Sequence, residues 1–482
     1  MLFSKRSLGF ASLAAVALFQ HTTAEIVVQT NLRRTNVVID EAIIPMEMQE
    51  MATEEYLTAN QTNIDALLNS QPTSLTDEIT IAATNSTCVT TSILVVMNKF
   101  NKTSQEFISC GTANGKQYSV AGVPDEVVQA NKHHIMNGDI ELSVTEGAYL
   151  NTATATLEMP KSKKNMQFFK AKRGKDKEEA GGKNLFDRTR RSLAVTGTRS
   201  ALTIRVVASG VATSVSEATL SNRVFGSGAD GTVDPITMKS HFNTCSHGQL
   251  NFVQAANRDG RTLRIRNGAI TVSVNYPIVR GDYRGLANAV IAELNSQFGV
   301  TNPNQLANHL MYFLPPGVIP GTALGYVPGD ETLYDNGWSD ASVLMHEVGH
   351  NLGMGHSGDS SGEYGDESCI MGGGFSENGA LLCYNAAKSW QMGWFASRDH
   401  TYNVADGMWN GRLIGQVDYA NGNDSTSKVN LKLNTPGNDD YFVMFNRIKT
   451  GTIESMNKVM ITKAGGEGVL PSQSTLIAVL GQ

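Results

Sequence analysis

One stretch of eleven residues constrains the local fold of this chain more than any other. It reads His346-Glu347-Val348-Gly349-His350-Asn351-Leu352-Gly353-Met354-Gly355-His356. On a helix, His346 and His350 would stand one turn apart on the same face, so that two imidazoles can reach one cation with Glu347 beside them. Gly353 would end the helix, because glycine adopts positive φ at no steric cost. The chain could then turn back and bring in His356 as a third ligand.

The residues on either side of this stretch fit the same helix. Leu344, Val348 and Leu352 form an apolar stripe away from the two histidines, which predicts an amphipathic helix resting on a core. Asp340 stands at the N-cap position, where its carboxylate could accept backbone N–H bonds. Downstream, Cys369-Ile370-Met371-Gly372 places Met371 in a glycine-rich turn, the Met-turn, which we expect to lie beneath the metal.

The residue types point to zinc and to hydrolysis. Three neutral imidazoles with an open fourth position are typical of a catalytic zinc site, in which the pKa of a bound water falls from about 15.7 to about 7. Glu347 is the natural general base, taking a proton from that water and passing it to the leaving amine. The whole pattern is that of the metzincin zinc peptidases. The alternative, a packed helix that no longer binds metal, gives Glu347 no role.

The stretch from Gly349 to Trp394 resembles the gametolysin family of secreted metzincins, known from volvocine algae as enzymes that digest extracellular glycoprotein matrix. The resemblance extends more weakly over most of residues 200–482. Some algal members carry Gln at the first ligand position, whereas this chain has His346. The resemblance implies an α+β, metzincin-type catalytic domain, with a mixed twisted sheet, helices, and zinc on the active-site helix. Beyond the zinc motif and the Met-turn it rests on His356-Ser357-Gly358, Gly362-Glu363-Tyr364-Gly365-Asp366 and Cys383-Tyr384-Asn385-Ala386-Ala387-Lys388-Ser389-Trp390-Gln391-Met392-Gly393-Trp394.

The amino terminus predicts secretion. Lys5 and Arg6 precede an apolar run over residues 8–19, and small residues follow before Glu25, so residues 1–24 are predicted to be a signal peptide. The apolar run is shorter than the roughly 20 residues of a membrane-spanning helix, so we expect no membrane anchor in the mature, extracellular form. Four Asn-x-Ser/Thr sequons fit N-glycosylation in the same pathway: Asn60, Asn85, Asn101 and Asn423.

A basic segment divides the chain. Residues 161–191 hold 12 Lys or Arg and 4 Asp or Glu, with few apolar residues, which predicts an exposed linker. The segment ends in an R-x-R-R sequence that a furin-type convertase would cut, formed by Arg188, Arg190 and Arg191 before Ser192. A basic linker that is never cut is the alternative. We therefore expect a propeptide over 25–191, a catalytic domain over 192–399 and a β-rich C-terminal portion over 400–482.

Hydrophobic periodicity places helices and strands in each part. In the α/β propeptide we expect a helix at 54–68 and strands at 78–83, 91–97 and 141–158. In the catalytic domain we expect helices at 234–243 and 283–298, and strands at 202–208, 250–253, 270–275 and 309–314, followed by a loop into the zinc helix. In the C-terminal portion we expect strands at 429–433, 441–445, 458–462 and 475–480.

Five cysteines suggest two disulfides and one thiol in an oxidising compartment. Cys88 and Cys110 both lie in the propeptide, where we expect a bond. Cys369 and Cys383 flank the Met-turn 14 positions apart, and we expect a second bond there. Closing a loop of that size contributes roughly 3 kcal/mol in the chain-entropy model. Cys245 would then be buried and free, or bonded to an unidentified partner.

Other candidate sites are weaker. An acidic loop with Asp359, Glu363, Asp366 and Glu367 could hold Ca²⁺ or stay solvated, but it lacks the pattern of a calcium loop, so calcium is unsupported. The formal net charge of −6 gives no reason to expect nucleic acid as a partner. Six histidines lack ligand spacing and are assigned no metal role: His133, His134, His241, His247, His309 and His400.

Latency is expected to differ from that of matrixin zymogens. In those zymogens, and in some gametolysin relatives, a propeptide cysteine in a P-R-C-G-V-P-D-like segment fills the open zinc position. The nearest equivalent here, residues 119–125, has Ala121 where the sulfur should be, and the match is either a remnant or an accidental turn. Latency would then need Cys110, a carboxylate such as Asp125, or steric cover. We expect a carboxylate or steric cover, because Cys110 is expected to be bonded.

The predicted function is that of a secreted zinc endopeptidase made as a zymogen, with extracellular matrix or cell-wall proteins as its protein or glycoprotein substrates. One alternative is a secreted matrix-binding or recognition protein in which the zinc helix is structural. Another is a peptidase that acts on peptide signals or foreign proteins. Intact ligands together with Glu347 favour an enzyme, while oligomeric state and cleavage preference stay open.

Overall fold

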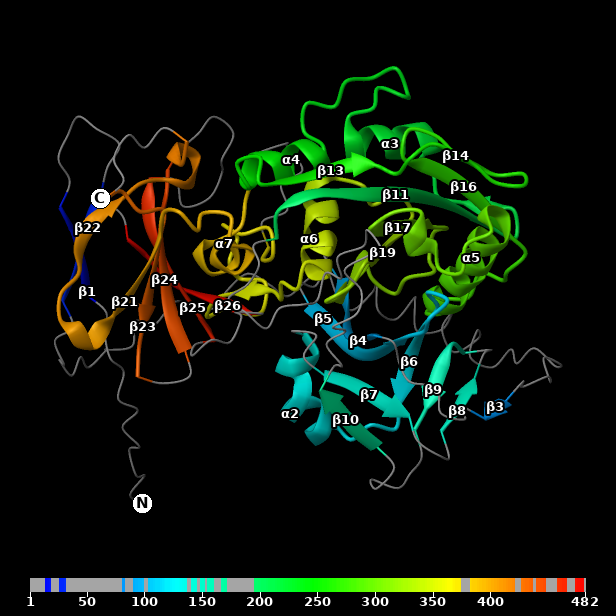
Figure 1. Ribbon diagram of the computed structural model, residues 1–482, viewed down its shortest axis with the longest axis horizontal. Coiled ribbons are helices and arrows are strands. Elements are labelled where there is room, and N and C mark those ends of the chain that lie inside the picture. The colour runs from blue at the N-terminus through cyan, green and yellow to red at the C-terminus, as the bar shows by residue number, and fades with distance from the viewer. Residues whose placement is uncertain are drawn as a thin grey trace, which may run out of the picture.

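The computed structural model describes the chain in segments, of which the longest runs over residues 195–373. The described residues are 14–18, 26–31, 80–82, 90–98, 103–136, 140–144, 148–151, 154–159, 166–170, 195–373, 382–420, 426–436, 439–447, 457–465 and 473–480. Figure 1 shows three groups of elements: N-terminal strands in cyan, a central sheet with helices in green and yellow, and a C-terminal sheet in orange and red. The fold is a mixed α+β arrangement.

The middle of the molecule is built on the long strand β11 (Gly197–Ala208). On one edge β11 pairs in parallel with β13 (Leu250–Gln254) and β16 (Ala269–Val274), and on the other with β17 (His309–Leu314). Next come β19 (Glu331–Asp335), parallel to β17, and β18 (Ala323–Val327), antiparallel to β19. Short pairings complete this region: β12 (Val211–Ala212) with β11, and β14 (Arg258–Asp259) with β15 (Arg264–Ile265).

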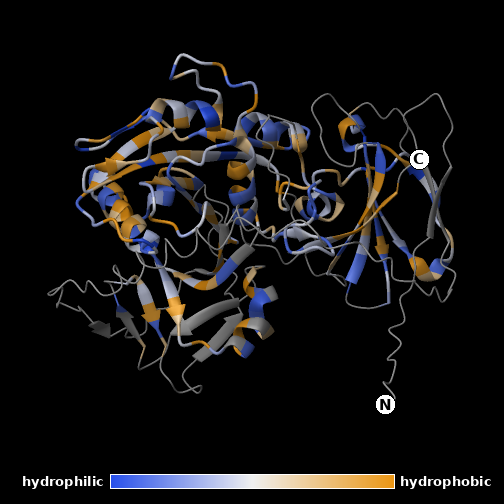
Figure 2. Cartoon of the chain, turned by 180° about the vertical axis from the view of Figure 1, so that it is seen from behind, coloured by the Kyte–Doolittle hydropathy of each residue, from blue (hydrophilic) through white to orange (hydrophobic). Residues whose placement is uncertain are grey.

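Helices cover both faces of this sheet because its strands are apolar on both sides. On β17, Leu310 and Tyr312 pack into the core under α5 (Tyr283–Phe298), while Met311 and Phe313 pack into the opposite core. That second core also contains side chains of α3 (Glu217–Phe225), α4 (Met238–Cys245) and α6 (Ala341–Asn351). Figure 2 shows apolar colour along α5 and the central strands. The zinc-motif helix α6 therefore lies in a buried layer.

The N-terminal strands extend this sheet at its edge. β4 (Thr90–Asn98) pairs antiparallel with β18, from Met97 opposite Ala323 to Ile93 opposite Val327. The sheet continues through β5 (Thr103–Gly111), β6 (Gln117–Ala121), β9 (Thr156–Glu158), β8 (Tyr149–Asn151) and β3 (Thr80–Ala82). The helix α2 (Asp125–Met136) and the pair β7 (Ile140–Val144) and β10 (Met166–Lys170) complete this group.

Beyond α7 (Ala386–Met392), on the side away from the central sheet, lies a six-stranded sheet (Figure 1). Its strand order is β20-β26-β25-β24-β23-β21. Its strands are β20 (Ser357–Gly358), β21 (Asp399–Asn403), β23 (Asn430–Asn434), β24 (Asp439–Asn446), β25 (Lys458–Gly465) and β26 (Ser474–Leu480). β20, which directly follows His356, pairs in parallel with β26. A further small sheet joins β1 (Ala14–Leu18), β2 (Ile26–Asn31) and β22 (Asn410–Leu413). Short 3-10 helices span Pro303–Gln305, Val404–Asp406 and Gln416–Asp418.

The predicted strands and the long helix of residues 200–314 are confirmed within a few residues, because their periodicity is strong. The predicted helix at 234–243 begins later, at Met238, since Thr237 caps it by accepting the Ser240 N–H. The predicted loop before the zinc helix is wrong, because it contains β19 and β18. The strand character predicted for 141–158 is found in three short strands, β7, β8 and β9.

Part of the predicted basic linker is also a strand. Residues 166–170 form β10, which pairs with β7 along its whole length. The linker prediction relied on the number of charged residues and overlooked the apolar residues Met166, Phe168 and Phe169. Residues 171–194, with the predicted cleavage sequence, and the predicted helix at 54–68 lie outside the described residues. The helices α2, α3 and α7 were not predicted.

Candidate metal centre

Helix α6 carries the first two histidines of the motif and is buried on all sides. Every residue from Ser342 to Asn351 is buried, although the sequence predicts only one apolar stripe. The difference arises because the sheet covers one side of α6 while α4 and the segment after His356 cover the other. Asp340 is the N-cap residue, but its side chain accepts no capping hydrogen bond, so that predicted interaction is wrong.

The three motif histidines come together at the end of α6. Each offers a ring nitrogen, and these atoms lie within 4.8 Å of one another. Gly353 has φ of 90°, in the left-handed region that the sequence predicts, and α6 ends two residues before it. This turn carries the chain back so that His356 faces the rings of His346 and His350, at centroid distances of 5.3 and 4.8 Å.

Hydrogen bonds fix which nitrogen of each ring is available. Nδ1 of His346 donates to the Ile370 carbonyl and Nδ1 of His350 donates to the Met354 carbonyl, both at 2.8 Å. Because each Nδ1 carries the proton, each Nε2 of a neutral ring carries the lone pair. The Nε2 atom of His350 is buried and has no hydrogen-bond partner among the described residues. Such an arrangement suits metal ligands whose outer nitrogen is held by a carbonyl.

The third ring is oriented by a carboxylate. Nδ1 of His356 donates to Oε1 of Glu363 at 2.6 Å, and the Glu363 side chain is 35% exposed. A carboxylate in this position fixes the ring and raises the basicity of the other nitrogen. All three rings thus present Nε2 toward the interior of one small site, and the donor set fits zinc.

Glu347 lies in the same buried region with both carboxylate oxygens unsatisfied. The residue is 0% exposed, and neither oxygen has a hydrogen-bond partner among the described residues. Burial raises the pKa of this carboxyl well above its usual range. Buried polar atoms in native proteins normally have a partner. An orphaned, buried carboxyl group on the residue that follows His346 therefore fits a site that works with an ion, water or substrate.

Burial also keeps the three imidazoles neutral. Desolvation lowers the pKa of His346 to about 4. It also lowers the pKa values of His350 and His356 well below the usual value, and the neighbouring rings act in the same direction. Neutral imidazole is the form that binds a metal ion.

Two glycines let other segments approach α6 closely. A Cβ atom on Gly349 would lie 2.6 Å from Sδ of Met371, so the methionine packs directly against the helix, as predicted for the turn beneath the site. A Cβ atom on Gly325 would lie 2.7 Å from the carbonyl oxygen of Glu347. Strand β18 therefore runs in contact with the helix at the level of the candidate general base.

The predicted disulfide between Cys369 and Cys383 is wrong. Cys383 is bonded to Cys245, whose Cα lies 5.4 Å from its own, and Cys369 is a buried free thiol. The expectation of a free Cys245 is therefore also wrong. Cys369 lies fully in the core, where burial raises its thiol pKa to about 12. Loop-closure cost grows only slowly with loop length, so proximity in the fold decided the pairing over proximity in the sequence.

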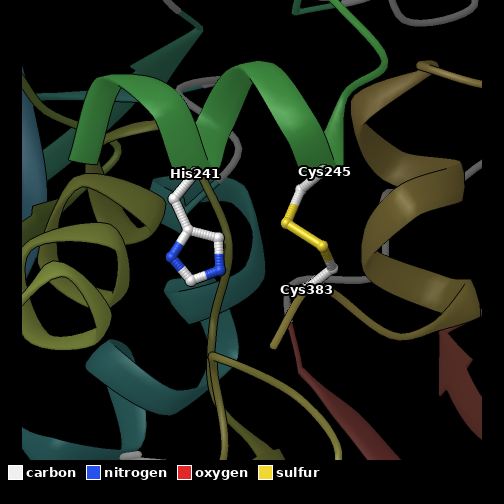
Figure 3. Close-up of side chains that lie close together, drawn as sticks. All are labelled: His241, Cys245 and Cys383. Carbon is white, nitrogen blue, oxygen red and sulfur yellow. A yellow bond between two sulfur atoms is a disulfide. The ribbon is translucent and has the colours of Figure 1, made fainter. Parts of the chain in front are cut away.

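Figure 3 shows His241 and Cys245 on one side of α4, with the disulfide to Cys383 beside the imidazole. These three residues could form a second group of metal ligands. The S–S bond engages both sulfur atoms, and Nε2 of His241 lies 2.8 Å from the Leu382 carbonyl oxygen. The group is therefore a structural cross-link in this form of the protein.

The remaining predicted sites are placed as follows. Cys110 is disulfide-bonded, so it is no thiol donor for latency, and its predicted partner Cys88 lies outside the described residues. Ala121 is exposed at the end of β6. The side chain of Asp125, the sequons at Asn60, Asn85, Asn101 and Asn423, and the cleavage sequence with Arg188, Arg190, Arg191 and Ser192 also lie outside the described residues.

The acidic loop that could hold Ca²⁺ uses its carboxylates internally. Asp359 accepts the N–H and O–H of Ser361, Glu363 holds His356, and the buried Asp366 accepts the Ser357 hydroxyl at 2.7 Å. These side chains point to different partners. The calcium alternative gains no support from this part of the structure.

Sequence reasoning missed two side chains near the site. Tyr364 is buried, and its hydroxyl lies 2.9 Å from Nε2 of His356. Lys388 is fully buried on α7, where desolvation lowers its pKa to about 7. Both belong to stretches that carry the family resemblance. The sequence feature that could have identified them is a polar side chain within a segment of otherwise apolar or small residues.

Comparison with known proteins adds the following. The sequence profile of the family described as Gametolysin peptidase M11 matches residues 200–457, more than half of the 482-residue chain. A protein named Autolysin from Chlamydomonas reinhardtii is 38% identical over 92 residues, which are 17% of this chain and 14% of that protein. The match thus spans about a seventh of that relative's length. No solved structure has significant similarity to the chain.

No helix among the described residues is both long and apolar enough to cross a membrane. The family match contains all three motif histidines, Glu347 and the Met-turn. It also covers the elements from β11, apart from its first three residues, to β24. The chain therefore belongs to the gametolysin family of metallopeptidases, peptidase M11.

Proposed function

We propose that this protein is a zinc endopeptidase in which His346, His350 and His356 hold the ion and Glu347 is the general base. The observation that carries the proposal is the buried cluster of three imidazoles, together with the unpartnered, buried carboxyl group of Glu347, the residue that follows His346 on α6. Zinc follows from the donor set, since three neutral imidazoles with an open position are typical of catalytic zinc sites. We infer a metzincin-type catalytic domain over residues 192–399.

Different groups of the chain have different roles in peptide hydrolysis. The ion, when bound, would act as a Lewis acid toward water and the peptide carbonyl. Glu347 accepts a proton from the attacking water and returns it to the leaving amine nitrogen. The carbonyls of Ile370 and Met354 and the carboxylate of Glu363 hold the three rings in orientation. Burial of the cluster strengthens each of these electrostatic interactions.

We also propose that the enzyme is secreted as a zymogen, with residues 1–24 as signal peptide and 25–191 as propeptide. Support comes from the pairing of β4 with β18, because β18 contacts α6 beside Glu347. While β4 occupies the edge of β18, no other extended peptide can pair there. Latency would then come from steric cover, and cleavage after Arg191 by a furin-type protease would permit the segment to leave.

The substrates we propose are extracellular matrix or cell-wall proteins. The family resemblance and the partial relative named Autolysin support this choice. The apolar amino terminus and the sequons support passage through a secretory pathway. The β-rich residues 400–482 contribute to the catalytic unit, since β20 from the third-ligand segment pairs with β26.

The test uses the full chain, secreted from a eukaryotic host and cleaved after Arg191. We expect one zinc per molecule by elemental analysis, and hydrolysis of an unbiased peptide pool. Glu347→Ala should keep zinc but lose about 10² to 10⁴ in rate, because it removes a positioned proton acceptor. His346→Ala, His350→Ala and His356→Ala should lose zinc. Near-normal turnover in Glu347→Ala would refute the mechanism, and full zinc occupancy in a histidine variant would exclude that residue as a ligand.

A further inference from the structure

Tyr364 lies against the histidine cluster. Its ring centroid is 4.2 Å from that of His356 and 6.0 Å from that of His346, to which it is nearly parallel. The side chain is 2% exposed, so it belongs to the interior of the site. Its hydroxyl is 2.9 Å from Nε2 of His356, the nitrogen that faces the other two rings.

The hydrogen bond from Tyr364 is accepted by the Nε2 lone pair of His356, the same lone pair that would bind a metal ion. Nδ1 of His356 carries the proton donated to Glu363, so Nε2 of the neutral ring is an acceptor and the Tyr364 hydroxyl is the donor. An ion bound to Nε2 takes that lone pair. The phenol can then no longer donate to this nitrogen, yet its oxygen remains beside the position of the ion.

The distance suits two ligands of one ion. Zinc–nitrogen bonds of about 2.0–2.1 Å place neighbouring ligand atoms about 2.9 Å apart at a right angle and about 3.4 Å apart at a tetrahedral angle. The observed separation of 2.9 Å between Oη of Tyr364 and Nε2 of His356 matches the first of these values.

Contacts independent of the metal hold Tyr364 in this position. The segment after β20 returns on itself, and Asp366 accepts hydrogen bonds from Ser357 and from Nδ2 of Asn385 at 2.7 and 3.0 Å. Gly365 permits the tight return, since a Cβ atom there would lie 1.7 Å from Oδ1 of Asp359. The phenol is therefore preorganised by its own hairpin.

We propose that Tyr364 is a fourth protein ligand of the metal, binding as phenolate through Oη. The inference rests on the proposed function, because it requires the three-histidine site to hold an ion. The phenol proton is released to solvent when the oxygen binds, as for other ligands that bind in deprotonated form. Tyr364 would thereby be an additional ligand beside the three histidines, in a five-coordinate site that still leaves a position for the attacking water.

The test is spectroscopic and uses the full chain loaded with Cu²⁺ in place of zinc. Phenolate bound to Cu²⁺ gives a charge-transfer absorption band in the visible region. We expect this band in the unaltered protein and its loss in Tyr364→Phe, together with about tenfold or greater weakening of zinc affinity. Tyr384→Phe is the matched control. It removes another buried hydroxyl, which donates to the Met345 carbonyl, and should keep the band.

The outcomes separate the two proposals. A protein that binds one Cu²⁺ without the band refutes Tyr364 as a ligand and leaves the three-histidine site intact, whether or not the phenylalanine variant folds. A band that persists in Tyr364→Phe assigns it to another tyrosine and also refutes the proposal. A protein that binds neither Cu²⁺ nor Zn²⁺ overturns both the ligand assignment and the proposed function.

Discussion

His241 and His309 are buried outside the metal cluster, and both are held neutral there. Burial lowers the pKa of His241 to about 4 and that of His309 to about 3. His241 also packs beside the Cys245–Cys383 bond, so its ring is part of a structural contact. At the scale of single residues, burial makes the folded state sensitive to acid.

Stability should fall as pH decreases from about 6.5 toward 4, because the unfolded chain binds a proton on His241 that the folded chain rejects. The contribution of His241 is complete above the unfolded pKa and declines by up to about 1.4 kcal/mol per pH unit within this window. His241→Gln keeps a donor for the Leu382 carbonyl but cannot be protonated. Urea unfolding at several pH values should show a shallower pH slope for this variant.

His134 offers the control, since it is exposed on α2. His134→Gln makes the same substitution at an exposed position, and its pH slope is the reference with which that of His241→Gln is compared. Equal slopes for His241→Gln and the unaltered protein would show that His241 contributes nothing to acid sensitivity.

Among the elements, α4 and the segment before α7 are joined by the bond between Cys245 and Cys383, which are 138 residues apart. We expect non-reducing peptide mapping to recover this pair and a free Cys369. Cys245→Ser should destabilise the protein by about 5 kcal/mol or less, the chain-entropy value for so long a loop. Cys369→Ser leaves the bond intact and serves as the control. Recovery of a Cys369–Cys383 peptide would contradict the pairing.

The pairing of β4 with β18 yields a second prediction at this scale. Val95 lies opposite Gly325, and proline there cannot donate a backbone hydrogen bond and disrupts a strand. Uncut Val95→Pro protein should therefore show part of the activity that the unaltered protein gains only after cleavage.

Thiol-modifying mercurials should not activate the uncut protein, because Cys110 is disulfide-bonded.

Leu150→Pro is the matched control, since it disrupts β8, which pairs with β3 and β9 rather than with β18. It should leave the uncut protein latent. Activation by mercurials without cleavage would point to a cysteine that blocks the metal. Full latency of Val95→Pro would show that the strand pairing is not what inhibits the enzyme.

At the scale of the whole molecule, the C-terminal sheet is tied to the metal centre. Ser474 of β26 contacts the Ser357 hydroxyl and accepts a hydrogen bond from Asn385, both at 3.0 Å, next to the third ligand. Met444 of β24 and Met460 of β25 pack against Ala387 of α7. The last strands thus support the segment that carries His356 and Tyr364.

Deletion of residues 466–482 removes β26 and should lower zinc affinity about tenfold or more, since it removes partners that orient the ligand segment. Ser474→Ala removes only the hydroxyl contacts and should have a smaller effect. Zinc titration and thermal unfolding of the two proteins measure this difference. Unchanged zinc affinity after the deletion would show that the C-terminal sheet is independent of the site.

Residue type and short spacing were enough to predict which residues gather at the candidate site. The motif histidines, Glu347, the turn at Gly353 and the packing of Met371 depend on residue type and short spacing, which act locally. The same is true of β11, β17 and α5, whose apolar periodicity is strong. Local spacing therefore predicted the residues that meet within one helix and its adjoining turns.

The distant segments that meet at the site could not be predicted from spacing along the chain. Three contacts join residues that are far apart in the chain: the Cys245–Cys383 bond, the pairing of β4 with β18, and the contact of Ser474 with Ser357. Their partners are selected by packing of the whole fold, which leaves no local pattern. The contact between Tyr364 and His356 could not be predicted either, although the two residues are only eight positions apart. It forms because the segment between them folds into a hairpin, which Asn385 holds by a hydrogen bond to Asp366.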